Sequence, residues 1–547
     1  MKTKIWHLSY WSETWSIQNS AIKRQFAIFV CFHLILSILF IFTQDCNVDE
    51  PGYFSYAYYW LRGNPYRENY GMDSKTILMF PATVFQFFKA YFPKELYEKD
   101  WSFFIKLGRP FLYCYPLLLI YTAFCWIVRL YNPGKFLIPL LFLAFDPMIF
   151  SFGLYIGSDL ASSSFLLLIC YSSWRYWQTK KAKYWFYVSF GFALGVLLKF
   201  TFIFLYIIPV LWYCFFLVKG NTITHKGSIV RLFQFIIIQL LVINILYYFT
   251  GTFSSLGDYT FNSNALSRIQ YRFKDSFLSE IPLLVPTPLL QGIDWLSYNK
   301  EYGGCNSLSS YNSVWFWGKE VCDGGIWYYY IGSALFKLPL IVWLAILSLA
   351  YYFFRSGNKK ILLEKYIFIW LPFLVLLIIL SFFNRFQIGF RHAMPLLGLG
   401  YIALGFVWLK WYQKRRKVFY ILVIANITSI LFYAPNFAAY TNEFILKKEN
   451  VINYMRDASV DYCLFNNKVD RYLEGHPGYK EPTSKPEAGK YIVPIIRVTC
   501  KYPDVPVNDL TWLRENFKPV GHYYHSLLIY EVSDEGLDRL KLNNEMK

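Results

Sequence analysis

The sequence predicts a polytopic α-helical membrane protein with a small α+β domain at its carboxyl end. Of its 547 residues, 56% are hydrophobic and only 16% are charged, which is more apolar surface than one soluble core can bury. The apolar residues gather in runs of about 18–22, the length that crosses a hydrocarbon layer of about 30 Å. Clusters of lysine and arginine recur at every second loop between these runs, as the positive-inside rule requires.

About eleven membrane-spanning helices follow from these runs. They are predicted near residues 25–44, 110–130, 135–152, 160–176, 185–200, 202–218, 231–250, 333–354, 365–383, 393–411 and 418–436. The basic clusters that place the amino terminus in the cytoplasm are Lys2, Lys4, Lys23 and Arg24; Arg175, Lys180, Lys181 and Lys183; Arg355, Lys359, Lys360 and Lys365; and Lys410, Lys414, Arg415, Arg416 and Lys417. An odd number of spans puts the carboxyl terminus outside. Membrane topology thus explains the net charge of +19. The placement of the basic residues in alternate loops argues against a nucleic-acid-binding surface.

The transmembrane domain, residues 1–436, is expected to carry two long external loops, residues 45–109 and 251–332. Within the first loop, residues 51–62 and 77–92 have helical spacing and are rich in aromatic residues. This composition favours helices that lie flat at the membrane interface. Within the second loop, the prolines of "IPLLVPTPLLQGIDW" favour extended chain.

A polar tail, residues 437–547, is long enough for one small external domain. Its segments "YIVPIIRV" and "SLLIYEV" are predicted strands, and "NDLTWLRENF" and "DEGLDRLKL" are predicted helices. Two pairs of cysteines, one in the second external loop and one in the tail, can form disulfides in an oxidising compartment. They are Cys305 with Cys322, and Cys463 with Cys500.

Ionisable side chains stand at the outer ends of the predicted spans, where charge is costly and usually functional. They are Asp49, Glu50, Arg109, Asp159, Lys199, Lys337, Arg391 and His392. Together they predict a polar cavity at the outer lipid–water boundary, in which cations hold a lipid-linked phosphate and a carboxylate acts on a hydroxyl. The alternative for each is snorkelling or a salt bridge between helix ends. That alternative is weakest for Asp49 and Glu50, which have no cation beside them.

Several motifs in this order resemble the GT-C membrane glycosyltransferases, especially the branch of protein O-mannosyltransferases and aminoarabinose transferases (glycosyltransferase families 39 and 83). The motifs are "VDEPGYFSYAYYWLRGNPY", "YIGSDLASSSFLLL", "GFALGVLLKFTF", "GGIWYYYIGSALFKLPL" and "IGFRHAMPLLGLG". The resemblance covers most of the chain. It implies a bacterial inner-membrane enzyme with a periplasmic carboxyl-terminal domain. It also implies transfer of a sugar from a polyprenyl phosphate to a periplasmic protein, lipid or glycan.

Carried over residue by residue, the resemblance makes Asp49 the catalytic base, with Glu50 orienting the first-loop helix or the acceptor. It places Asp159 and Tyr53 near the acceptor or the sugar. The residues expected to neutralise the departing phosphate are Lys199, Arg391, Lys337, Arg109 and His392. No cofactor is required, although Asp49 and Asp159 could hold a divalent cation. His392 stands where relatives commonly have tyrosine, which leaves the sugar and the acceptor open.

Other functions remain open at this point. A whole-glycan transferase or ligase of similar fold uses the same cavity. A flippase for lipid-linked sugars needs charged or broken helices near the midplane and an internal repeat, and the sequence has neither. A non-catalytic membrane subunit would tolerate Asp49→Asn. Two carboxylates alone also fit a glycosidase, but the accompanying cations favour transfer from a lipid phosphate.

Overall fold

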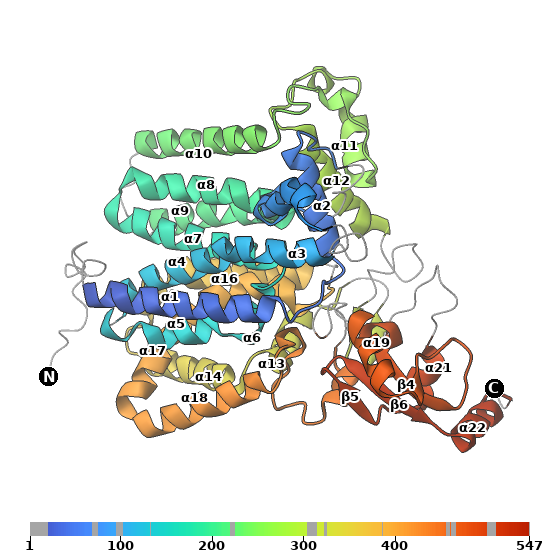
Figure 1. Cartoon of the computed structure of the whole chain (residues 1–547). Coiled ribbons are helices and arrows are strands. Elements are labelled where there is room, and N and C mark those ends of the chain that lie inside the picture. The colour runs from blue at the N-terminus through green and yellow to red at the C-terminus, as the bar shows by residue number, and fades with distance from the viewer. Residues whose placement is uncertain are drawn as a thin grey trace.

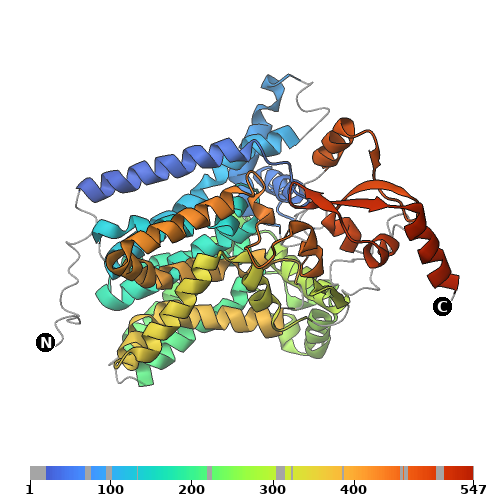
Figure 2. The ribbon, with the colours of Figure 1, turned by 90° about the horizontal axis from the view of Figure 1, so that it is seen from below.

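The structure of the chain is a computed structural model. It describes residues 20–67, 75–93, 102–131, 133–218, 225–302, 314–321, 325–384, 387–455, 460, 466–499 and 510–545. Long helices lie side by side in one bundle, and a smaller domain of helices and strands sits beyond one end of it (Figures 1 and 2). The four cysteines of the two predicted disulfides lie outside the described residues.

Each of the eleven predicted spans coincides with one or two helices of the bundle. These helices are α1 (Ser20–Ile41), α4 (Cys114–Leu130), α5 (Leu137–Ala144), α6 (Pro147–Phe152), α7 (Ser158–Thr179), α8 (Ala182–Leu198), α9 (Ile207–Val218), α10 (His225–Leu246), α13 (Tyr329–Lys337), α14 (Leu340–Arg355), α16 (Ile367–Ile378), α17 (Met394–Lys414) and α18 (Arg416–Leu431). The short α15 (Lys359–Lys365) joins α14 to α16.

Four helical segments among the described residues are long and apolar enough to cross a membrane, or five when one bent pair counts as a single span. That pair is α13 and α14, which meet at 118° at Pro339, where a helix cannot continue. Other segments are interrupted, such as α5 and α6, which are separated at Asp146. The chain therefore has the helices of a multi-pass membrane protein, and the count of eleven spans stays a prediction.

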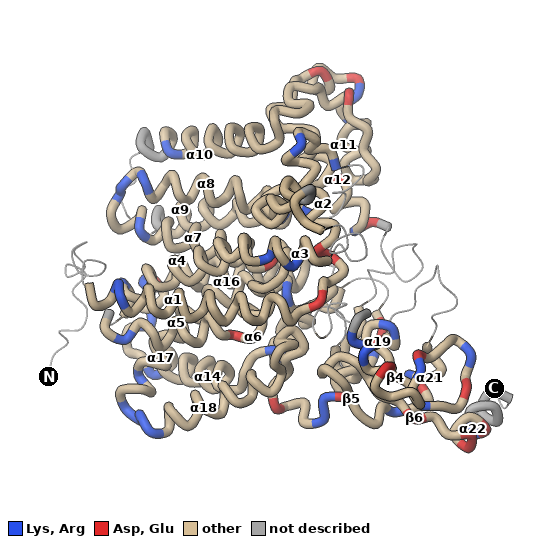
Figure 3. The backbone as a smooth tube through the Cα atoms, viewed as in Figure 1, with Lys and Arg blue, Asp and Glu red and all other residues tan. Residues whose placement is uncertain are grey.

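Charge is distributed unevenly along the bundle. Lysine and arginine gather at the end where the described chain begins, whereas the tail domain sits beyond the opposite end (Figure 3). The predicted alternation of basic loops therefore appears in space as one basic end.

The first loop folds into α2 (Glu50–Leu61), the 3-10 helix η3 (Ile77–Tyr91), α3 (Ser102–Gly108) and the 3-10 helix η5 (Arg109–Tyr113). Both predicted helices of this loop therefore exist. Tyr53, Tyr56 and Trp60 of α2 are buried against the rest of the protein, and the expectation that these helices lie flat at the membrane interface stays a prediction. At Gly108 the helix α3 approaches η3 so closely that a Cβ atom would stand 2.2 Å from the carbonyl oxygen of Ala82.

The second loop contains α11 (Asn264–Phe273), α12 (Thr287–Tyr302) and a hairpin of β1 (Val314–Phe316) and β2 (Lys319–Val321). Residues 281–286 are not helical, as the prolines predict, but α12 begins directly after them. Pro288 is compatible with α12 because the first turn of a helix leaves its N–H groups unpaired in any case. The expectation of extended chain through residue 295 is therefore wrong.

The tail contains a four-stranded sheet of order β3-β4-β6-β5. Its strands are β3 (Tyr479–Lys480), β4 (Gly489–Pro494), β5 (Gly521–Tyr523) and β6 (Leu527–Val532), and its helices are α19 (Asn466–Gly475), α20 (Ile495–Thr499), α21 (Thr511–Asn516) and α22 (Asp534–Glu545). The predicted strand at 491–498 is correct only in its first half, since α20 takes the second. Tyr491, Leu528 and Leu513 share a core that Phe336 of the bundle joins.

Short 3-10 or π-helical segments complete the described elements. They are η6 (Pro133–Lys135), η7 (Phe200–Tyr206), η8 (Leu256–Asp258), η9 (Phe277–Ser279), η11 (Ile379–Phe383), η12 (Phe390–Ala393), η13 (Phe437–Ala439) and η14 (Lys448–Asn453). Two of them matter for function. The element η12 carries Arg391, and η7 begins immediately after Lys199.

Candidate active site

Asp49 stands directly before α2, where a short turn fixes its backbone. The side-chain oxygen of Asn47 accepts hydrogen bonds from the backbone N–H groups of Asp49 (2.9 Å) and Glu50 (3.0 Å). Such a turn is typical of asparagine at the start of a helix. Pro51 follows in the first turn of α2, where it is tolerated. The sequence "NVDEP" therefore presents the Asp49 carboxylate at the helix start.

Two carboxylates and three cations meet at this point. One Asp49 oxygen lies 3.1 Å from the Lys75 ammonium, and the other lies 2.7 Å from a guanidinium nitrogen of Arg391. The same Arg391 nitrogen lies 3.7 Å from Asp159, whose other oxygen is 2.5 Å from the Lys199 ammonium. We call these five residues the charge cluster. Arg391 joins its two halves.

Five separate segments of the chain deliver these side chains. Asp159 lies in the first turn of α7 and Lys199 caps the end of α8, and each position suits the charge that it carries because of the helix dipole. Arg391 follows Gly389, whose φ of 146° is accessible to glycine and disfavoured for other residues. Lys75 crosses Gly52 of α2, where a Cβ atom would stand only 2.6 Å from the lysine Cε.

Tyr53 and His392 border the charge cluster. The hydroxyl of Tyr53 is 2.9 Å from the Ser158 hydroxyl, and the Lys75 ammonium lies 4.8 Å from the centre of the Tyr53 ring. His392 is half-buried, and it interacts electrostatically with Lys199 and Asp159. The structure therefore brings both side chains to the cluster.

Asp49 is ionised over the whole physiological range. Burial alone would raise its pKa, but the charges of Arg391 and Lys75 outweigh that effect and hold the pKa of Asp49 well below its usual range. A carboxylate held in this way is a weak base until one of its cations is drawn elsewhere.

Glu50 and Arg109 form a separate, fully buried ion pair. Two nitrogens of Arg109 donate to the two Glu50 oxygens at 2.8 and 2.7 Å. Glu50 also accepts from the backbone N–H groups of Asn47 and Ile156, both at 2.9 Å. Arg109 donates further to the carbonyls of residues 41, 44 and 45. Glu50 thus ties the start of α2 to Arg109, and its orienting role stays a prediction. The predicted contact of Arg109 with a phosphate does not fit this geometry, because Arg109 is 1% exposed and surrounded by acceptors.

Lys337 is also placed differently from the prediction. Its ammonium is fully buried and donates to the carbonyl oxygens of Ala438 (2.9 Å) and Tyr440 (2.5 Å). These carbonyls belong to the connection between the bundle and the tail domain. Lys337 therefore anchors that connection, and the predicted contact with the donor phosphate is wrong in this geometry.

The carboxylates of Asp49 and Asp159 do not fit a divalent cation in this arrangement. The guanidinium of Arg391 already contacts both of them. Across the described ranges, no three His, Cys, Asp or Glu side chains form a group that could ligate a metal. Positive charge between the two carboxylates is thus supplied by an arginine.

Lys75 is the member of the charge cluster that the sequence did not reveal. It lies in the first loop, where neither periodicity nor a span boundary marks it. Buried Arg67 fixes the backbone there, because its guanidinium donates to the Lys75 carbonyl oxygen at 3.0 Å and to the Tyr247 hydroxyl at 2.9 Å. A signal that could have found it is the glycine of "DEPGY", which leaves room for a long side chain over α2.

Part of the chain matches a known family of membrane glycosyltransferases. Residues 112–248 match the family described as dolichyl-phosphate-mannose-protein mannosyltransferase. The resemblance is confirmed over that segment. It contains Asp159 and Lys199 of the charge cluster, whereas Asp49, Lys75 and Arg391 lie outside it.

The chain is also similar to the crystal structure of ArnT from Cupriavidus metallidurans bound to undecaprenyl phosphate. The TM-score is 0.45 and the sequence identity is 12%, with 82% of this chain and 72% of that chain covered. No curated protein sequence matches the chain.

Proposed function

We propose that this protein is an inverting glycosyltransferase that moves a sugar from a polyprenyl-phosphate donor to an acceptor hydroxyl at the outer face of the bacterial inner membrane. The observation that carries the proposal is the charge cluster, in which one guanidinium joins two carboxylates and two ammonium groups. The mannosyltransferase match of residues 112–248 supports the reaction class. The acceptor is a periplasmic protein, lipid or glycan.

The charges of the cluster suit this reaction. Lys75, Lys199 and Arg391 carry three positive charges against the two negative charges of Asp49 and Asp159, so one positive charge is in excess. A polyprenyl phosphate that carries a sugar is a phosphodiester with one negative charge. The cluster and the donor are therefore neutral together.

The same balance holds after transfer. Asp49 removes the proton of the acceptor hydroxyl as its oxygen bonds to the anomeric carbon, and the bond from that carbon to the phosphate oxygen breaks. The product polyprenyl phosphate is a monoester that carries close to two negative charges at neutral pH. Protonation of Asp49 leaves two positive charges in excess, which match it. Cations at the place where charge develops are an effective means of lowering a barrier.

The donor also activates the base. Its phosphate competes with Asp49 for the Arg391 guanidinium, since anions bind arginine with paired, charge-assisted hydrogen bonds. Once Arg391 turns to the phosphate, the pKa of Asp49 rises and the carboxylate accepts a proton more readily. Asp159 retains Lys199 and faces the sugar or the acceptor together with Tyr53. The attack comes from the side opposite the phosphate, so the anomeric configuration inverts.

The test is label transfer by purified protein. Wild type and Asp49→Asn in detergent receive a panel of radiolabelled polyprenyl-phosphate sugars together with membrane extract. Loss of the base is expected to lower the transfer rate by about 10²–10⁴-fold, while the thermal unfolding of the variant stays cooperative. Asp275→Asn is the matched control, because Asp275 is exposed in the second loop.

Two outcomes contradict the proposal. Equal transfer by wild type and Asp49→Asn removes Asp49 from catalysis. No transfer by wild type with any donor, together with passage of the donor across sealed vesicles, identifies a flippase instead.

A further inference from the structure

The segment before Asp49 is wrapped around one buried side chain. Arg109 donates hydrogen bonds to the carbonyls of Ile41, Gln44 and Asp45 and to both oxygens of Glu50. We call residues 41–50 the strap. Asn47 closes its far end through the turn that holds Asp49. A displacement of the strap is therefore transmitted to Asp49.

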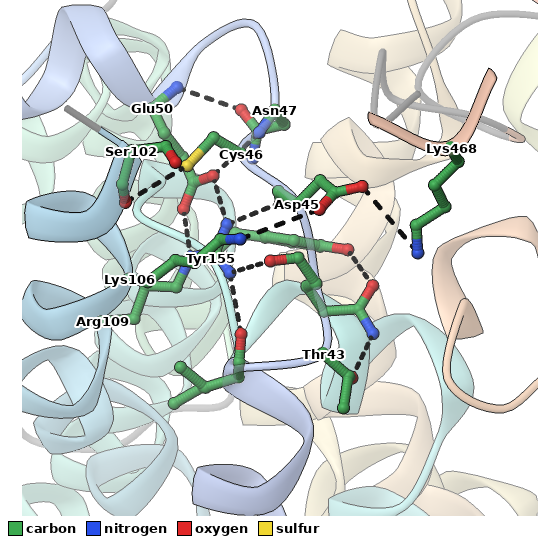
Figure 4. A network of polar contacts seen from close by, with 12 residues as sticks. Thr43, Asp45, Cys46, Asn47, Glu50, Ser102, Lys106, Arg109, Tyr155 and Lys468 are labelled. Atoms are coloured by element: carbon green, nitrogen blue, oxygen red, sulfur yellow. Dashed lines mark hydrogen bonds and ion pairs between the residues drawn. The ribbon is translucent and has the colours of Figure 1, made fainter. Parts of the chain in front are cut away.

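The tail domain contacts the strap directly. The ammonium of Lys468 in α19 lies 3.9 Å from one oxygen of Asp45, and Lys106 of α3 lies 3.7 Å from the other (Figure 4). The same Lys468 ammonium lies 3.4 Å from the centre of the Tyr524 ring. Asp45 thus stands between a lysine of the first loop and a lysine of the tail.

A second contact joins the strap to the connection that leads into the tail. The Gln44 side-chain nitrogen donates to the Pro435 carbonyl oxygen at 2.5 Å. The Tyr155 hydroxyl donates to the Gln44 side-chain oxygen at 3.1 Å. Residues of the carboxyl-terminal part of the chain therefore contact both Gln44 and Asp45.

We propose that Lys468 is a positioning residue, through which the tail domain holds Asp45 and thereby keeps Asp49 in the charge cluster. The consequence for catalysis rests on the proposed function, but the hold on the strap does not. Lys468 is 6% exposed, and a buried ammonium is unfavourable without a carboxylate beside it. Because Asp45 and Asp49 are only four positions apart, a loosened strap misplaces the base.

The pH dependence of this contact has a definite sign. Burial lowers the pKa of Lys468 to about 8, with Asp45 acting to raise it and Arg471 and Lys106 acting to lower it. The ammonium, which also faces the Tyr524 ring, is charged below that pH. The hold on Asp45 is therefore present at neutral pH and is lost as the pH rises through about 8.

The test measures how accessible the strap is and does not depend on catalysis. The thiol of Cys46 is half-buried beside Asp45 and donates to the Ser102 carbonyl oxygen at 3.7 Å. Its alkylation rate in the full chain is measured by mass spectrometry, with buried Cys125 and Cys170 as internal references. Lys468→Met is expected to raise the Cys46 rate about fivefold at pH 7, and Lys468→Arg is expected to restore it. Near pH 9 the ratio of variant to wild type is expected to fall toward one.

Lys490→Met is the matched control, because Lys490 is an exposed tail lysine whose partner is Glu531 at 3.2 Å. It is expected to leave the Cys46 alkylation rate unchanged.

In sugar transfer, Lys468→Met is expected to lower kcat with little change in the donor KM. An unchanged Cys46 rate in Lys468→Met overturns the proposal. If Lys468→Met unfolds, Asp45→Asn repeats the test from the other side of the contact. If wild type transfers no sugar, the proposed function fails, and the Cys46 rates still decide whether Lys468 holds the strap.

Discussion

Asp49 has cations on both of its oxygens, although none is near it in the sequence. Arg391 and Lys75 arrive from segments that precede α17 and follow α2. Four members of the charge cluster were predicted because they stand at the outer ends of spans, and such ends share one membrane face. Lys75 could not be predicted in this way, because its position depends on how the first loop folds over Gly52.

The roles of Arg109 and Lys337 show the limit of the same reasoning. Sequence position indicates the depth of a charge in the membrane, but it does not indicate which way the side chain faces. Arg109 faces Glu50, and Lys337 faces the carbonyls of Ala438 and Tyr440. Both were assigned to the phosphate because their internal partners are invisible in sequence.

Lys75→Met is expected to shift the acid side of the pH profile of sugar transfer. The nearby Lys75 contributes to the lowered pKa of Asp49, so its removal raises that pKa. The base must be ionised to act. The acid limb of kcat/KM therefore moves to higher pH in the variant, and kcat/KM falls most at low pH.

A matched control for this experiment is Lys274→Met, since Lys274 is exposed in the second loop. It should leave the profile in place. An acid limb of Lys75→Met that coincides with that of wild type contradicts the assignment of that limb to Asp49.

At the scale of elements, the buried pair of Glu50 and Arg109 locks the first loop to the bundle. Glu50→Gln leaves an uncompensated guanidinium in a site with no exposure. The expected loss is about 3–5 kcal/mol of unfolding free energy, because a broken buried ion pair leaves one charge unpaired. Thermal unfolding in detergent measures it as a lower Tm.

The surface variant Glu515→Gln provides the comparison. Glu515 pairs with Arg514 at 3.3 Å and is 63% exposed, so its loss should cost at most about 1 kcal/mol. Equal Tm values for Glu50→Gln and Glu515→Gln would show that the buried pair is not a structural lock.

Prediction of elements succeeded where periodicity was long and failed at boundaries. The apolar runs gave the helices of the bundle, and α2 and η3 appeared where helical spacing predicted them. The start of α12 was missed because Pro288 was taken as a helix breaker, although the first turn tolerates it. The second half of "YIVPIIRV" became α20 because strand β4 ends at Pro494, after which no sheet partner is left.

At the scale of the whole molecule, the basic end of the bundle and the tail domain lie at opposite ends (Figure 3). With the basic end in the cytoplasm, the tail is expected outside. An amine reagent that cannot cross membranes, applied to intact cells, should therefore modify the exposed tail lysines Lys480 and Lys490. It should spare Lys414 and Lys417, and peptide mass spectrometry measures both.

Lysis before labelling provides the control, because it should expose all four lysines. Modification of Lys414 and Lys417 in intact cells, with protection of the tail, would invert the proposed orientation. The charge cluster would then face the cytoplasm.

The position of Arg391 between Asp49 and Asp159 has a consequence for the sequence of events in turnover. The Arg391 guanidinium is ion-paired with the Asp49 carboxylate, and in this pair Asp49 is a weak base. Only the arrival of the donor uncovers it, so under the proposed function the donor binds first and the acceptor second. An acceptor alone finds no partner for its proton. The activated carboxylate exists only when the donor is already seated, so water can attack the sugar in the interval before the acceptor arrives, and slow hydrolysis of the donor is expected when no acceptor is supplied.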